Sequence, residues 1–175
     1  MHPPLPEVTL RALRDDDLDL LERWVQVPDV FAFLDDDTPP SRARIRAELL
    51  ARRLDVLIID TAEEPVGFFL VYPRRRGGVR EFDIAIPETR ARQGGVAKAA
   101  IAAFERWAFD AQKLTAVHAN IFPENRPCLE LVRACAWPLS PVDPGGIEFR
   151  GKPRDVVYTH MNEKLLPGAR SKRGF

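Results

Sequence analysis

The segment from Arg92 to Ala97, Arg-Gln-Gly-Gly-Val-Ala, is the part of this sequence best suited to bind an anion. It lies between an apolar stretch expected to form a strand, 82–86, and an alanine-rich stretch expected to form a helix, 95–110. Two glycines let the backbone turn tightly and approach a ligand closely, and the first N–H groups of a helix have no partner within it. The helix dipole and the charge of Arg92 both favour a phosphate there. A glycine turn can also serve only to change the direction of the chain.

Length and charge limit the classes of protein to consider. With 175 residues, 45% of them hydrophobic, the chain is long enough for one sizeable core, so we expect a single domain over 1–166 and a basic tail over 167–175. Lys plus Arg equals Asp plus Glu at 26 each, which argues against a nucleic-acid partner. Residues 1–40 hold ten acids and three bases, a net charge of −7, and the rest must carry +7. An anionic cofactor and a cationic acceptor could each be accommodated, although such charge runs also occur on ordinary solvated surfaces.

Neither a membrane segment nor a metal site is expected. The chain has no apolar run near the ~20 residues of a membrane span, and its N-terminus lacks the layout of a secretory signal, so we expect a cytoplasmic protein. Cys128 and Cys135 are seven residues apart in one expected helix. A helix separates them by roughly 10 Å, which is beyond disulfide reach. Neither belongs to a cluster with metal-ligand spacing, so both are expected to be small buried side chains.

The hydrophobic patterns predict alternating strands and helices. Strands are expected over 8–11, 56–60, 66–72, 79–86, 114–120, 147–150 and 156–161. Helices are expected from Leu18 to the residue before Pro28, and over 41–53, 95–110 and 124–135. The three strands within 56–86 form an antiparallel meander. The strand-helix-strand unit over 79–120 predicts a parallel pair joined by a right-handed crossover.

This order of elements matches the GNAT superfamily of acetyl-CoA-dependent N-acetyltransferases, and two motifs resemble those of the family. Arg92-x-x-Gly95-x-Ala97 resembles the acetyl-CoA motif R/Q-x-x-G-x-G/A. Asn125-Arg126-Pro127-Cys128-Leu129 through Cys135-Ala136-Trp137 resembles the later Asn-x-x-Ala/Ser…Gly-Phe segment. The opening over 9–18 and the ending over 149–157 look most like the ribosomal-protein alanine N-acetyltransferases, and aminoglycoside N-acetyltransferases are similar too. The resemblance covers residues 8 to about 163.

The resemblance implies an α+β fold with acetyl-CoA as the acetyl donor. Its mixed, mainly antiparallel seven-stranded sheet would be flanked by about four helices, with the fourth and fifth strands parallel and splayed. Backbone N–H groups of the fourth strand would bind the thioester oxygen. The cofactor-binding residues would be Ile84, Ala85, Ile86, Arg92, Gln93, Gly94, Gly95, Val96, Ala97 and Asn125, with Lys98 and Arg133 toward the remaining phosphates. Two departures stand out: Val132 occupies the position of a tyrosine that protonates the departing thiolate, and Ala136-Trp137 replaces Gly-Phe.

Amide formation from a thioester needs a neutral amine and therefore a base. Glu81 and Asp83 are two residues apart on an expected strand and project from one face, where a carboxylate could take the proton directly or through water. Glu81 is the preferred base, and His118 on the next strand is a second candidate. The alternatives are a pair of solvated acids on an exposed sheet face and a hydrogen-bonded structural histidine.

The acceptor half of the reaction is expected at the loop between the first two helices. In the resembled family that loop lies beside the acceptor, so Phe31, Asp35, Asp36 and Asp37 are expected to attract a cationic amine. The acceptor is either a protein N-terminus or a small amine, as in the aminoglycoside-type enzymes. We expect direct transfer in a ternary complex without an acetyl-cysteine, because neither cysteine has an adjacent activator. A CoA-binding module without catalysis is the alternative; the chain is expected to be a monomer or a homodimer.

Overall fold

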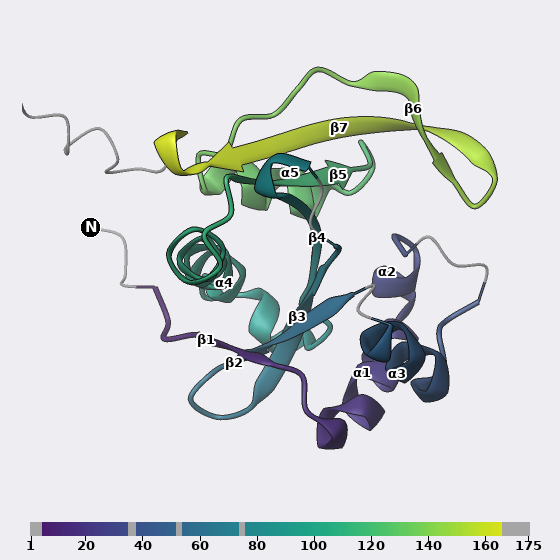
Figure 1. The fold of residues 1–175 in the computed structure, drawn as a ribbon, viewed down its shortest axis with the longest axis vertical. Coiled ribbons are helices and arrows are strands. Elements are labelled where there is room, and N and C mark those ends of the chain that lie inside the picture. Colours follow the sequence, from purple (N-terminus) through teal and green to yellow (C-terminus); the bar gives the residue numbers. More distant parts are fainter. Residues whose placement is uncertain (1–4, 35–37, 52–53, 74–75, 166–175) are drawn as a thin grey trace, which may run out of the picture.

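The computed structural model describes residues 5–34, 38–51, 54–73 and 76–165 (Figure 1). A seven-stranded sheet runs through this part of the chain in the order β1-β2-β3-β4-β5-β7-β6. Its strands are β1 (Thr9–Ala12), β2 (Asp55–Asp60), β3 (Pro65–Val71), β4 (Val79–Ala85), β5 (Ala116–Ile121), β6 (Asp143–Phe149) and β7 (Lys152–Asn162). β4 and β5 run parallel, and the other five neighbouring pairs are antiparallel. The mixed, mainly antiparallel sheet and its parallel pair are as predicted.

Helices cover both faces of the sheet. They are α1 (Leu18–Val25), α2 (Pro28–Phe31), α3 (Arg42–Leu50), α4 (Val96–Glu105) and α5 (Arg126–Ala134). Figure 1 shows α1, α2 and α3 grouped on one side of β3, with α4 on the other side. Local signals set where they begin: Pro28 is at the first position of α2, Ser41 caps α3 through the N–H of Arg44, and Asn125 caps α5 through the N–H of Cys128.

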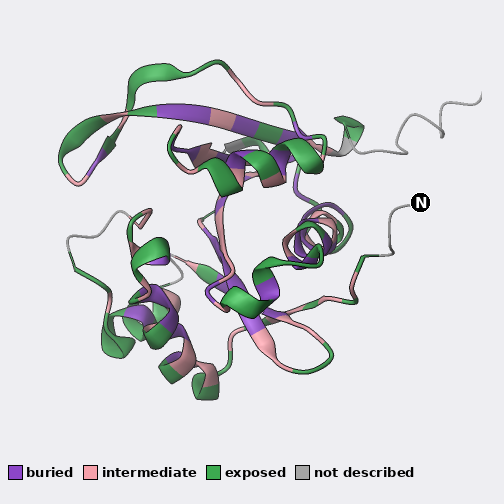
Figure 2. Ribbon diagram, turned by 180° about the vertical axis from the view of Figure 1, so that it is seen from behind, coloured by how far each residue is buried: buried purple, intermediate pink, exposed green. Residues whose placement is uncertain are grey.

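Two hydrophobic clusters hold these layers together (Figure 2). On the α4 and α5 face, the ring of Phe104 stacks on Phe69 at 4.5 Å and lies 4.6 Å from Phe82. On the opposite face, Trp24 of α1 stacks on Phe68 of β3 at 6.0 Å. Apolar residues therefore occur at consecutive positions of β2 and β3, because both faces of these strands are covered.

The parallel pair separates partway along its length. β4 and β5 pair over Val79–Glu81 and Ala116–His118. Beyond these residues β4 stays paired with β3 as far as Ala85, and β5 stays paired with β7 as far as Ile121. Each strand keeps its outer neighbour while the two diverge from each other, which is the predicted splay.

The structure changes several predicted boundaries. There are five α-helices in the described residues, one more than expected, because the loop after Pro28 contains the single turn α2. The helix predicted over 95–110 is α4 only as far as Glu105, and it continues as a π-helical segment, Arg106–Ala111. The last two strands are longer than predicted. Pro153 lies near the start of β7, where a missing N–H is tolerated, so the chain pairs again directly after the turn at 150–151.

Candidate active site

The turn before α4 contains two consecutive glycines, so its backbone carries no side chain of its own at these positions. Gly94 and Gly95 have φ of 73° and 83°, in the left-handed region that glycine occupies without strain. Gly95 is the N-cap of α4 and has no side chain to accept a hydrogen bond from the first turn. A Cβ built at Gly94 meets nothing within 4 Å, whereas one at Gly95 would lie 3.1 Å from a methyl of Leu5. The N-terminal segment therefore passes beside this turn.

Arg92 fastens the turn to the rest of the molecule. Its Nε donates to the carbonyl oxygen of Ile86 at 2.8 Å, and its Nη1 donates to Asp29 of α2 at 3.1 Å. Nearby, Trp24 of α1 donates to Glu88 at 2.9 Å. The segment between β4 and α4 is thus held against the α1 and α2 side of the molecule.

The other predicted cofactor residues lie along α4 and α5. In the first turn of α4, Val96 is buried, Ala97 is half-buried and Lys98 is exposed. Asn125 uses its side-chain oxygen to cap α5, 3.3 Å from the N–H of Cys128. Gln93 and Arg133 are exposed, the latter in the last turn of α5.

The backbone of β4 has its free edge where the strands separate. Glu81 directs its carbonyl toward β3, where it accepts from the N–H of Tyr72 at 2.9 Å. Because backbone directions alternate along a strand, Asp83 and Ala85 also face β3, and a Cβ at Gly67 of β3 would collide with the carbonyl oxygen of Ala85. The N–H of Ile84 therefore points toward the β5 side.

Polar side chains gather on the face of β4 and β5 that lies opposite α4. Glu81 accepts from Asn120 at 2.8 Å and lies 3.3 Å from Nε2 of His118. All three side chains are half-buried, so the predicted pair of β4 acids does not lie on a fully solvated face. Asn120 was not among the predicted site residues, although its spacing of two from His118 places both on one face of β5.

Asp83 occupies the position beyond the last paired residues of β4 and β5. Its Oδ2 accepts from the hydroxyl of Tyr72, the residue directly after β3, at 2.7 Å. Burial raises the pKa of Asp83 to about 6, the Tyr72 hydrogen bond opposes that rise, and the charge of Glu81 adds to it. Tyr72 was also missed by the sequence analysis, because its contact depends on the register between β3 and β4.

Cys128 lies in α5 and Cys135 is the C-cap residue of that helix, and both are half-buried. Burial raises the pKa of Cys128 to about 11, with a further contribution from the charge of Asp83. Burial likewise raises the pKa of Cys135 to about 11. At neutral pH both are therefore thiols and poor nucleophiles. Val132, in the position of the expected tyrosine, is buried in the core.

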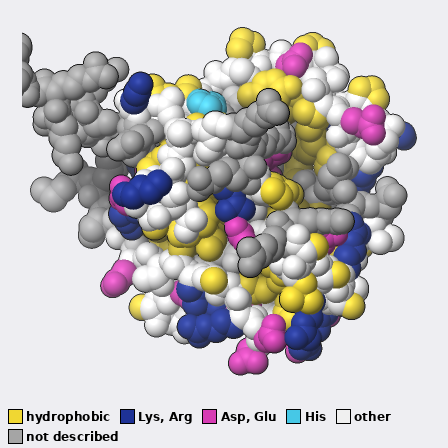
Figure 3. Space-filling model, in the orientation of Figure 1, with side chains coloured by type: hydrophobic (Ala, Val, Ile, Leu, Met, Phe, Trp, Pro, Cys, Tyr) yellow, Lys and Arg dark blue, Asp and Glu magenta, His cyan; other side chains and the backbone are white. Residues whose placement is uncertain are grey.

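The structure describes only one of the four residues predicted to bind the acceptor. Phe31 is half-buried at the end of α2, under the guanidinium of Arg150, while Asp35, Asp36 and Asp37 lie outside the described residues. On the face seen in Figure 3, basic and acidic side chains are interspersed.

Among the described residues, no group of three or more His, Cys, Asp or Glu could hold a metal ion. None of the helices described here has the length and apolar character needed to cross a membrane.

Comparison with known proteins gives one family and several similar structures. The model of an acetyltransferase (GNAT) domain matches residues 7–136. No curated protein matches the chain. A spermidine N-acetyltransferase from Vibrio cholerae, solved with CoA and spermine, has 16% identity and a TM-score of 0.77 over 90% of this chain and 96% of its own. The aminoglycoside acetyltransferase AAC(6')-Ib, solved with ribostamycin and coenzyme A, has 17% identity and a TM-score of 0.75 over 96% and 98%.

Proposed function

Because the chain belongs to the GNAT acetyltransferase family, we propose that it transfers an acetyl group from acetyl-CoA to a primary amine by direct attack in a ternary complex. The observation that carries this proposal is the left-handed Gly94-Gly95 turn at the start of α4, beside the separated ends of β4 and β5. A turn alone could be structural. Its position beside diverging parallel strands supports a ligand-binding role in addition.

The residues present fit acetyl-CoA. The turn has open space at Gly94, and the N–H groups of the first turn of α4 suit the diphosphate. We assign the exposed Lys98 and Arg133 to the remaining phosphates, and Gln93 and Asn125 complete the proposed cofactor set. Arg92 would act by holding the turn through Ile86 and Asp29. Bound acetyl-CoA supplies the thioester whose acetyl group is transferred.

The β4 backbone is suited to polarise the acetyl carbonyl. Of the predicted residues Ile84, Ala85 and Ile86, Ala85 faces β3, so Ile84 and Ile86 are the better donors. A backbone N–H is fixed in place before the substrate binds and therefore needs no reorganisation during the reaction. This assignment depends on strand direction and is independent of the side chains at these positions.

We assign the base to Asp83 in preference to Glu81. A catalytic base works best when its pKa is near the operating pH, and the pKa of Asp83 is raised to about 6. Glu81 is held by Asn120 and approached by His118, an arrangement suited to placing charge beside the acceptor. With Val132 in the tyrosine position, the departing thiolate leaves unassisted, since a thiol pKa of ~8.5 makes it a tolerable leaving group.

The acceptor that these charges favour is a small amine carrying more than one positive charge. Glu81 and Asp83 place two carboxyl groups on one sheet face, and the three loop acids at 35–37 would add to them. Two similar structures were solved with spermine and with ribostamycin, and each of these molecules carries several amino groups. A protein N-terminus is the second candidate, because the opening and the ending of the sequence resemble the ribosomal-protein alanine N-acetyltransferases.

Two measurements test the proposal. Calorimetry with acetyl-CoA tests the donor half, and an absence of binding would contradict it. Thiol release on a panel of polyamines, aminoglycosides and N-terminal peptides tests the acceptor half. Binding without turnover on every amine would favour a CoA-binding module. In the same assay, neutralising Asp35, Asp36 and Asp37 together should raise the KM of a cationic amine and leave that of acetyl-CoA unchanged.

A further inference from the structure

Arg150 lies in the tight turn that joins β6 to β7. Phe149 pairs with Lys152, and the two residues between them, Arg150 and Gly151, have φ of 50° and 69°. Two positive φ values are typical of the type I′ turn, whose first central position is usually Asn, Asp or Gly. Arginine is an unfavourable choice there, because its Cβ is crowded in the left-handed region. A residue held in such a conformation is a reason to look for a role of its side chain.

The side chain of Arg150 reaches from this turn to the end of α2. Its Nη2 donates to the carbonyl oxygens of Phe31 at 2.7 Å and Leu34 at 3.0 Å. The guanidinium lies 4.5 Å from the ring centre of Phe31 and 5.0 Å from that of Phe149. A cation is favoured at a helix C-terminus, where carbonyl groups lack partners within the helix. The Arg150 side chain therefore connects the β6–β7 turn to residues that lie at least 116 positions earlier in the sequence.

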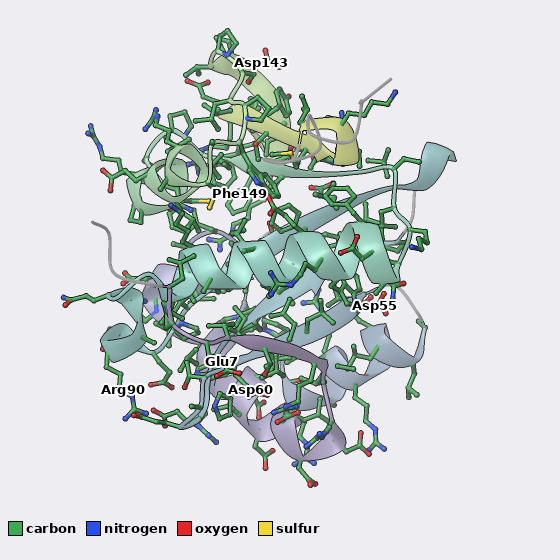
Figure 4. All side chains as sticks on the ribbon, turned by 90° about the vertical axis from the view of Figure 1, so that its left-hand side faces the viewer. Glu7, Asp55, Asp60, Arg90, Asp143 and Phe149 are labelled. Atoms are coloured by element: carbon green, nitrogen blue, oxygen red, sulfur yellow. The ribbon has the colours of Figure 1, made fainter. Side chains whose placement is uncertain are left out.

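Aromatic rings extend this connection to the end of β5. Phe33 stacks on Phe122 at 6.1 Å, and Phe122 meets Phe149 edge-to-face at 4.7 Å. Phe149 is buried, and Figure 4 shows it on the inner side of the hairpin, whereas Asp143 of β6 lies at the periphery. Phe122 follows His118 and Asn120 at a spacing of two, so it continues the same face of the strand. The contact is therefore at the end of the polar face that contains Glu81.

We propose that Arg150 is a positioning residue that holds the loop over 31–34 against the β6–β7 hairpin and so sets the acceptor side of the site. The hydrogen bond to the Leu34 carbonyl oxygen connects the hairpin to the segment that precedes the predicted acceptor acids in the sequence. The kinetic part of this inference rests on the proposed acetyltransfer function. Arg150 touches no reacting group and acts through the loop.

Arg150→Asn is the decisive variant, because asparagine suits a type I′ turn and preserves the hairpin. We expect the acceptor KM to rise roughly tenfold, since hydrogen bonds to a charged donor are lost, while the KM of acetyl-CoA stays unchanged. Hydrogen exchange of the backbone amides over 28–34 should become faster. Arg150→Lys, which keeps the charge but not the planar group, should lie between wild type and Arg150→Asn.

Lys152→Asn is the matched control, because it removes one positive charge from the same turn with an exposed side chain. It should leave both measurements unchanged. If Lys152→Asn reproduces the effects, the charge of the turn and not the Arg150 contact is responsible. Unchanged exchange over 28–34 in Arg150→Asn would overturn the inference. Exchange reports on the loop even if no amine is acetylated, so failure of the proposed function and failure of this inference are distinguishable.

Discussion

The Gly94-Gly95 turn and the polar face around Asp83 both lie near the separated ends of β4 and β5, but they are built in different ways. The turn consists of consecutive residues, and its proposed role in binding an anion depends on their backbone N–H groups and φ values. The polar face combines Tyr72, directly after β3, with Asp83 of β4 and Asn120 of β5, and it depends on side chains. The first kind of site is local in the sequence. The second exists only after the sheet has formed.

This difference leads to opposite expectations for mutation. The turn should tolerate changes of side chain and fail when its backbone conformation is altered. The polar face should keep its backbone under substitution and fail when single polar groups are removed.

Asp83→Asn should have the largest effect. Removing the base should lower kcat by about 100-fold or more, measured as thiol release under saturating acetyl-CoA and amine. Stability should not fall: the raised pKa means that ionised Asp83 disfavours the folded state above about pH 6, and this cost disappears below the ordinary pKa near 3.8. The unfolding free energy of the variant relative to wild type should therefore be higher at pH 8 than at pH 4.

Glu81→Gln is the comparison for that result. It removes the other carboxylate of the same face and keeps an oxygen for the hydrogen bond from Asn120. We expect a loss of about tenfold or less, mainly in the KM of the amine. A loss of kcat equal to that of Asp83→Asn would return the role of base to Glu81.

Gly95→Ala should weaken acetyl-CoA and spare the amine. Alanine at a φ of 83° costs about 1–2 kcal/mol, and its Cβ would crowd Leu5. We expect the acetyl-CoA KM to rise about tenfold, with little change in the amine KM. Gly77→Ala has a similar φ of 78° and open space in a distant turn, so it should lose stability but keep its acetyl-CoA KM. Equal effects of both variants on acetyl-CoA would contradict a binding role for the turn.

Tyr72→Phe should shift the pH dependence of kcat and change the maximal value of kcat little. The Tyr72 hydroxyl stabilises the charged form of Asp83, so its removal should raise the pKa of Asp83 above about 6. The acidic limb of kcat against pH should then shift to higher pH. A limb that stays in place would indicate that a group other than Asp83 is titrating.

Cys128→Ala and Cys135→Ala should have the smallest effect. Both thiols have their pKa raised to about 11 and are protonated at neutral pH. Turnover should therefore persist in each variant, as measured by acetylated amine formed. Loss of chemistry with acetyl-CoA binding retained would instead point to an acetyl-cysteine.

Much of the fold could be predicted from local patterns. The parallel pair followed from a strand, a helix and a strand of the right length, and the start of α4 followed from two glycines before an alanine-rich run. Boundaries were harder where tertiary contacts override local signals. The last strand was predicted to begin only at residue 156, but pairing with β6 starts β7 at Lys152 and includes Pro153. The short helix α2 was read as loop because four residues show no helical periodicity.

The sequence by itself determined the turn that we propose for acetyl-CoA, since Arg92 to Ala97 are consecutive and their backbone geometry follows from residue type. It also determined that the two acids of β4 share one face of that strand. Only the tertiary structure decided that Tyr72 donates a hydrogen bond to Asp83 and that Asn120 donates one to Glu81. The same is true of the hydrogen bonds from Arg150 to the carbonyl oxygens of Phe31 and Leu34. Those contacts depend on strand register and packing between distant segments, and burial at the resulting positions sets the pKa of the groups.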